Sequence, residues 1–207
     1  TYSTDNRLEL QSHFREWIAN QKFDSVNRKI LLVTAEGGAL RTGAFTSMFL
    51  SKIMTLNPEL RNKVYAFSTV SGGSLGVGFF NAMAYLDSGS AQVNGDEFGI
   101  RTEKFFSNDM LAPVLAKMFY ADILNGFWPK SITSMDKAVA LEESWESSFY
   151  TTYSKADHQN IFSTDFLSLY NNSSDSSSVV NYPVWLINTT EVETGKQAYI
   201  SNVKTKG

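Results

Sequence analysis

The chain alternates short apolar runs with glycine-rich turns and longer amphipathic segments. Lys29 to Thr34 is a continuous apolar run that predicts a strand buried on both faces of a parallel sheet. After a glycine-rich turn, the apolar face of residues 44–56 predicts a helix that ends before Asn57-Pro58. A second strand is predicted at 64–70 and a second, nearly all-apolar helix at 75–86. This order predicts an α/β fold around a mainly parallel sheet, with both glycine-rich turns at the same carboxyl edge, where ligands bind.

The two ends of the chain add a helix and a hairpin to this core. Thr4, Asp5 and Asn6 are good capping residues for an amphipathic helix that contains His13, which we interpret as a surface or packing residue. Residues 183–189 and 196–201 read as strands around the turn Glu193-Thr194-Gly195. They predict a hairpin at one edge of the sheet.

The middle of the chain is different in character. Residues 87–99 and 171–178 are rich in Gly, Ser, Asp and Asn and predict loops. The stretch 105–128 is apolar and aromatic, is interrupted by Pro113 and ends at Pro129. It fits an apolar cap over a binding site, and it fits ordinary core helices with solvated lysines nearly as well; the lysines are Lys104, Lys117 and Lys130.

A further helix is predicted from a cap at Ser134 to about Thr152. Its apolar face contains Ala138, Leu141, Trp145, Phe149 and Thr152. The glutamates on its other face fit a solvated surface better than acid-base or metal chemistry; they are Glu142, Glu143 and Glu146. We expect residues 1–207 to form one domain in which 87–180 is a helical insertion.

Composition narrows the chemistry. The net charge of -3 and the lack of a basic run argue against nucleic acid as a partner. Without cysteine and with only two histidines, a thiolate nucleophile or a typical zinc centre is not expected, and no cofactor is predicted. No apolar run is long enough to span a bilayer. The compartment stays open, with a cytoplasmic or membrane-peripheral location favoured.

The clearest candidate site is Gly72-x-Ser74-x-Gly76, which follows the strand at 64–70. It matches a nucleophile elbow, in which a serine occupies a strained turn between a buried strand and a buried helix. Glycine is expected at both flanks because side chains there would collide where strand and helix approach. The alternative is a glycine-rich turn between core elements with an incidental serine.

The first glycine-rich turn complements this elbow. Acyl transfer by a serine requires preorganised donors for the developing oxyanion, and backbone N–H groups at a helix start provide them. Gly37, Gly38 and Ala39 fit this oxyanion role, and Arg41 either positions the turn or a lipid phosphate or is a solvated residue at a helix end. A dinucleotide or nucleotide phosphate site is disfavoured because neither G-x-G-x-x-G nor a P-loop ending is present.

Gly37-Gly38-Ala39-Leu40-Arg41 followed by Val70-Ser71-Gly72-Gly73-Ser74-Leu75-Gly76 resembles the patatin-like phospholipase family, with kinship to the catalytic domains of cytosolic phospholipases A2. Ala39 stands where the family has a third glycine. Residues 188–195 resemble the family's Asn-Ala-Thr-Asp-x-x-Thr-Gly region. The resemblance implies a three-layer α/β sandwich, a Ser-Asp dyad with Ser74 as nucleophile, a lipid ester substrate and peripheral contact with membranes. It also favours 87–180 as a lipid-facing insertion, in which 105–128 is a cap or acyl-binding wall whose lysines meet lipid headgroups.

In the family, the catalytic aspartate stands in an Asp-Gly-Gly or Asp-Gly-Ala motif after this hairpin. No aspartate in the chain is followed by Gly-Gly or Gly-Ala, and every aspartate precedes the hairpin. We therefore expect the base in the C-terminal remainder of the domain, beyond Gly207, and expect this fragment alone to be inactive.

Two other functions compete with this hypothesis. A Ser-His-Asp esterase would use His158 as base, with Asp122 or Asp136 orienting it, and the chain order allows this. However, His158 has no preceding strand to place it at the carboxyl edge of the sheet. The other is a non-catalytic lipid-binding module that has kept the fold.

Overall fold

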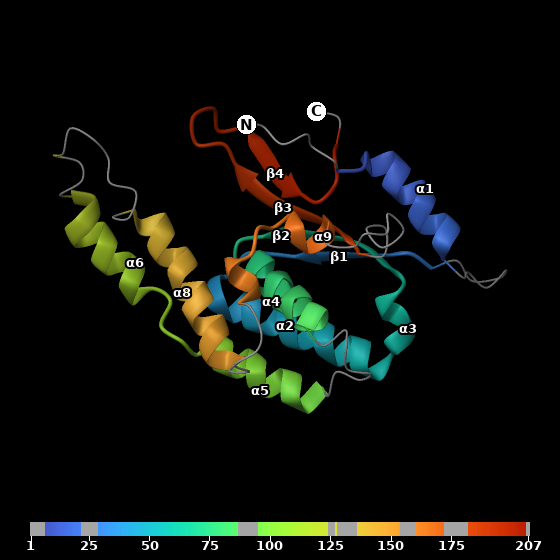
Figure 1. Ribbon diagram of the computed structural model, residues 1–207, viewed down its shortest axis with the longest axis horizontal. Coiled ribbons are helices and arrows are strands. Elements are labelled where there is room, and N and C mark those ends of the chain that lie inside the picture. Colours follow the sequence, from blue (N-terminus) through green and yellow to red (C-terminus); the bar gives the residue numbers. More distant parts are fainter. Residues whose placement is uncertain are drawn as a thin grey trace. The chain divides into compact units, whose positions relative to one another are not determined.

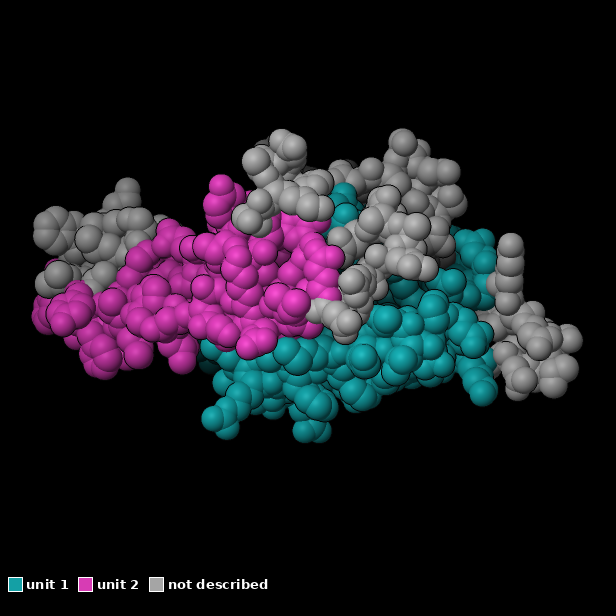
Figure 2. Space-filling model, turned by 90° about the horizontal axis from the view of Figure 1, so that it is seen from below, with its two compact units in different colours: residues 1–95, 165–207 teal, residues 96–164 magenta. Residues whose placement is uncertain are grey.

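The structure is a computed structural model of the 207-residue chain, and it describes residues 7–21, 29–86, 95–123, 127, 136–153, 160–171 and 182–205. The chain divides into two compact units (Figure 2). Unit 1 comprises residues 1–95 and 165–207, and unit 2 comprises residues 96–164. Each unit has its own helices and its own buried side chains.

Unit 1 contains a four-stranded sheet with the strand order β1-β2-β3-β4 (Figure 1). The strands are β1 (Leu31–Ala35), β2 (Val64–Val70), β3 (Val184–Thr190) and β4 (Gln197–Ser201). The first three are parallel, and β4 pairs antiparallel with β3. The predicted α/β fold with a mainly parallel sheet is confirmed, and so is the hairpin near the C-terminal end.

The helices of unit 1 follow the predicted order. They are α1 (Leu10–Asn20), α2 (Ala39–Leu56), α3 (Pro58–Arg61), α4 (Gly72–Leu86) and α9 (Ser168–Asn171). α2 connects the parallel strands β1 and β2, lies beside α4, and α4 contacts both strands (Figure 1). Both long helices start earlier than the predicted positions 44 and 75, because residues of the glycine-rich turns form their first turns.

The core of unit 1 includes a cluster of Trp17, Tyr65, Val184 and Val203, in which α1 packs on the sheet. His13 is buried, and its ring lies 5.8 Å from that of Tyr65, so it is a packing residue. The residues expected to cap this helix, 4–6, lie outside the described part of the chain, and α1 begins after Glu9.

The prediction that the first strand is buried on both faces is wrong. β1 lies at the end of the strand order, and Leu32 is 70% exposed. Apolar side chains make a strand suitable for burial, but whether each face is buried depends on which elements pack against it.

Unit 2 is helical. Its elements are α5 (Gly95–Phe106, from residue 96 onward), α6 (Ala112–Ala116), the π-helical turn η2 (Lys117–Asp122), α8 (Lys137–Thr152) and η4 (Ile161–Ser163). The rings of Phe105, Phe149 and Phe162 lie 4.8–6.4 Å apart and form its aromatic core. α5 begins at residue 95, so the predicted loop 87–99 is too long. Residues 87–94 lie outside the described part of the chain, and so does most of the other predicted loop, 171–178.

The buried face of α8 differs from the predicted one. Of the predicted face, only Phe149 and Thr152 are fully buried, and the other buried positions carry small or hydroxyl side chains: Ala140, Ser144 and Ser148. The hydroxyls of Ser144 and Thr152 donate to the carbonyls of Ala140 (2.6 Å) and Ser148 (2.7 Å) one turn earlier. Burial leaves neither hydroxyl without a partner, which is why polar residues are tolerated there.

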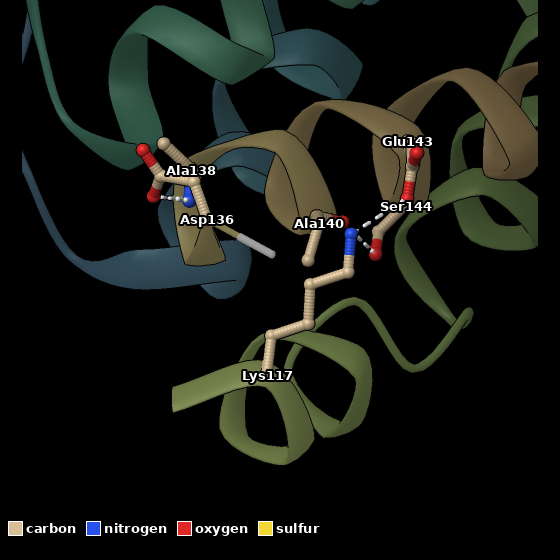
Figure 3. A network of polar contacts seen from close by, with 6 residues as sticks. All are labelled: Lys117, Asp136, Ala138, Ala140, Glu143 and Ser144. Carbon is tan, nitrogen blue, oxygen red and sulfur yellow. Dashed lines mark hydrogen bonds and ion pairs between the residues drawn. The ribbon is translucent and has the colours of Figure 1, made fainter. Parts of the chain in front are cut away.

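Asp136, rather than Ser134, caps α8. Its carboxylate accepts a hydrogen bond from the backbone N–H of Ala138 at 2.9 Å (Figure 3). The predicted cap, Ser134, lies outside the part of the chain that the structure describes. The Lys117 ammonium lies 3.3 Å from the Glu143 carboxylate (Figure 3), so the structure pairs a lysine expected to meet headgroups with a glutamate expected to be solvated. Within the described residues, no helix meets the length and hydropathy needed to cross a bilayer.

Candidate active site

The two glycine-rich turns meet at one edge of the sheet. β1 and β2 are parallel neighbours, with Ala35 opposite Thr69, so both strands end at the same edge. A Cβ atom built on Gly37 would lie 3.3 Å from Cβ and 3.8 Å from Oγ of Ser71. The first turn therefore lies next to the serine that directly follows β2.

Ser71 occupies the strained position between strand and helix. It is exposed, its φ is +52°, β2 ends at Val70 and α4 begins at Gly72. A non-glycine residue in this left-handed region is uncommon, and the strain persists only where the surrounding structure fixes it. An exposed, strained serine on a strand-to-helix turn is the geometry of a nucleophile elbow.

The sequence prediction placed Ser74 on this turn, and that placement is wrong. Ser74 lies in the first turn of α4, where its backbone N–H donates to the carbonyl of Ser71 at 2.9 Å. Its Oγ donates to Oγ1 of Thr69, also at 2.9 Å. The Gly-x-Ser-x-Gly spacing favoured Ser74. The sequence feature that indicates Ser71 is its position immediately after the apolar strand.

Thr69 connects α4 to the sheet beneath the turn. Its side chain is only 1% exposed, and its Oγ1 accepts hydrogen bonds from Ser74 and from the indole Nε1 of Trp185 at 2.9 Å each. The same hydroxyl donates to the carbonyl of Leu186 at 3.5 Å. Asn188 on β3 donates from Nδ2 to the carbonyl of Thr69 at 3.1 Å. These bonds fix the end of β2 against β3 and hold the start of α4 in place.

Close backbone contacts explain the glycines around the elbow. A Cβ on Gly72 would overlap the carbonyl of Ala39, and one on Gly76 would lie 2.5 Å from the carbonyl oxygen of Gly43. The steric need for glycine predicted at these two positions is present, although the crowding comes from α2 and its first turn. A Cβ on Gly73 would lie 2.6 Å from the carbonyl oxygens of Ala35 and Glu36, so this position is equally restricted, although the sequence did not single it out.

The turn expected to form the oxyanion site has an unusual backbone. Gly38 has φ +156° and Ala39 has φ +54°, and α2 begins at Ala39. Gly37, Gly38 and Ala39 are all exposed, and the backbone nitrogen of Ala39 lies 3.1 Å from the position of a Cβ on Gly72. The turn before α2 and the start of α4 therefore lie next to each other, and a site for acyl transfer needs such a placement.

The structure does not place every other predicted site residue near the β2–α4 turn. Arg41 is exposed in the first turn of α2, close in sequence to the turn, and its role stays a prediction. His158 lies outside the described residues, and the side chain of Asp122 is outside them too. Asp136 is engaged as the cap of α8 in unit 2. The described residues contain no cluster of His, Cys, Asp and Glu able to hold a metal ion.

Comparison with protein-family models finds no match, and comparison with curated proteins finds none either. Among solved structures, the chain is similar to human GIVD cytosolic phospholipase A2 in complex with methyl gamma-linolenyl fluorophosphonate. For the structure that also contains terbium chloride, the sequence identity is 12%, the TM-score is 0.44, and the match covers 93% of this chain and 26% of that one. Without terbium, the identity is 12%, the TM-score 0.43 and the coverage 92% and 25%. The chain thus spans about a quarter of the length of these proteins, and the likeness is remote.

Proposed function

We propose that the β2–α4 turn belongs to the active site of a serine acyl hydrolase that acts on lipid esters, with Ser71 rather than Ser74 as the nucleophile. The observation that carries this proposal is the closeness of Gly37, in the first glycine-rich turn, to the exposed, left-handed Ser71. Ser74 instead has a hydrogen bond to Thr69 that suits a residue holding the elbow in shape.

The reaction we propose has two halves. Ser71 Oγ attacks the ester carbonyl carbon while its proton passes to a carboxylate base, and the carbonyl oxygen becomes an oxyanion. The N–H groups of Gly38 and Ala39, with that of Gly72 after the nucleophile, stabilise this charge. The intermediate collapses to an acyl-serine and releases the alcohol, which takes up the proton. Water then attacks the acyl-serine by the same route and releases the fatty acid.

The base in this proposal is an aspartate, as the sequence resemblance implies. None of the chain's aspartates stands in an Asp-Gly-Gly or Asp-Gly-Ala motif. The proposal therefore assigns the base to an aspartate outside these 207 residues. An ordinary carboxylate is a weak base near neutral pH, so the oxyanion turn must supply a large part of the acceleration.

Two features support a lipid as the substrate. The paired motifs resemble those of patatin-like phospholipases, and Arg41 beside the oxyanion turn suits a lipid phosphate. In unit 2, the apolar stretch after α5 exposes several large side chains, namely Leu111, Leu115, Phe119, Tyr120, Ile123 and Phe127. We propose that the insertion at 87–180 contributes a lipid-facing cap, although Phe105 and Met110 in the same stretch are core residues.

Two serine variants test the proposal. In the full-length protein, Ser71→Ala should lower the rate of lipid ester hydrolysis by about four orders of magnitude or more, since the nucleophile is lost. Ser74→Ala removes one hydrogen bond below the turn and should cost about tenfold or less. His158→Ala should leave the rate unchanged. Full activity of Ser71→Ala would refute the proposed nucleophile, and loss of activity only in Ser74→Ala would restore the sequence prediction.

A further inference from the structure

α2 turns mostly small side chains inward and several large apolar ones outward. The buried positions of this helix are Gly43, Thr46, Ser47, Leu50 and Ser51. Apart from Leu50, these residues are small, as the close crossing with α4 requires, because Gly76 lies there against the backbone of Gly43 and the side chain of Thr46. That crossing has room only for small residues, and the exposed Phe45 and Phe49 take no part in it.

These large residues form one exposed stripe along α2. Phe45 is 67% exposed and Phe49 50%, and their rings stack with centroids 5.8 Å apart. Met48 and Leu56 are exposed as well. At about 100° per residue, the spacing of these four positions places them on one side of the helix. A stacked aromatic pair that faces water is a surface able to bury apolar area against a partner.

The same side of α2 is positively charged. Arg41 and Lys52 lie on the stripe, both exposed, and the helix contains no acidic residue. The chain as a whole has a net charge of -3. A stripe of aromatic and aliphatic side chains between two cations, in an otherwise acidic protein, complements a surface that is apolar inside and anionic outside.

We propose that the α2 stripe, consisting of Arg41, Phe45, Met48, Phe49, Lys52 and Leu56, docks on anionic phospholipid bilayers. The apolar side chains enter the acyl boundary while the two cations meet headgroup phosphates. This inference extends the proposed function, because α2 begins at Ala39 of the oxyanion turn and docking brings that turn to the lipid surface.

Vesicle cosedimentation of the full chain tests the proposal without any turnover. The vesicles are phosphatidylcholine alone and phosphatidylcholine mixed with phosphatidylglycerol. Wild type should bind the mixed vesicles more strongly. Phe45→Ser with Phe49→Ser should weaken that binding about tenfold or more through lost apolar burial, and Lys52→Gln should weaken it about fivefold, on the anionic vesicles only.

An exposed apolar pair on β4 provides the control. Tyr199 and Ile200 are 43% and 55% exposed and lie outside the proposed lipid-facing insertion, and replacing both with serine should leave binding within about twofold of wild type if α2 is the docking surface. Unchanged binding of the Phe45/Phe49 variant would overturn the proposal, as would equal binding of wild type to both vesicle types. Since binding is measured without hydrolysis, failure of the proposed nucleophile would not alter either result.

Discussion

Replacing Gly76 with alanine tests the close crossing of α2 and α4 beside the candidate site. The added Cβ would lie 2.5 Å from the carbonyl oxygen of Gly43 and 2.9 Å from Cβ of Thr46. Neither atom is the end of a flexible side chain, so α2 itself must shift. Overpacking of this kind costs about 1–3 kcal/mol, and alanine returns about 0.5–1 kcal/mol of helix stability. We expect a net loss of about 1–2 kcal/mol, or about 2–8 °C in Tm for a chain of this size.

Thermal unfolding followed by circular dichroism measures this loss, and Gly78→Ala on the same helix is the matched control. A Cβ at position 78 would meet only the indole ring of Trp185, at 3.2 Å, which leaves a side chain rather than backbone to give way. The control should stay within about 0.5 kcal/mol of wild type. Equal stability of the two variants would refute the close crossing and, with it, the explanation for the outward-facing residues of α2.

Three further predictions concern single side chains. Burial raises the pKa of Tyr65 to about 12, so the neutral phenol is favoured in the folded state, and wild type should lose stability as the pH rises from about 10 through 12. In urea unfolding at alkaline pH, Tyr65→Phe should lose less stability than wild type between pH 10 and 12, because it has no phenol at this position to ionise. An equal decline in the stability of both proteins would contradict this prediction. Asp136→Ala should cost about 1 kcal/mol by removing the cap of α8, whereas Asp136→Asn should retain most of it in thermal unfolding. Breaking the exposed pair of Lys117 and Glu143 with Lys117→Met should change the unfolding free energy by less than about 1 kcal/mol in a urea titration.

The arrangement of strands and turns was predictable because it depends on local pattern. The apolar run at 64–70 and the glycines after it predict a strand, a tight turn and a helix, and β2 and α4 have this form. The meeting of the two turns follows from the parallel order of the strands. The exact turn residue was not predictable from spacing alone, because the serines at 71 and 74 both lie among glycines. The end of the strand decides between them, and element ends are the least certain part of a sequence reading.

Features that depend on packing between elements were not predictable from the sequence. Hydrophobicity predicted Leu141 and Trp145 on the buried face of α8, yet Ser144 and Ser148 lie deeper there, with the Ser144 hydroxyl bonded within the helix. A pattern of apolar residues also did not reveal that α2 faces its phenylalanines outward, since that follows from the glycines of α4. The Thr69 network gave no local signal in the sequence, because it depends on Trp185, which lies 116 residues further along the chain.

The most direct test of the proposed active site is the residue that a fluorophosphonate modifies. The full-length protein is incubated with an alkyl fluorophosphonate, digested, and the adduct located by fragment-ion mass spectrometry. The proposal predicts a single adduct on Ser71, absent from Ser71→Ala and retained in Ser74→Ala. An adduct on Ser74, or an unmodified elbow peptide in protein that hydrolyses lipid esters, would contradict it.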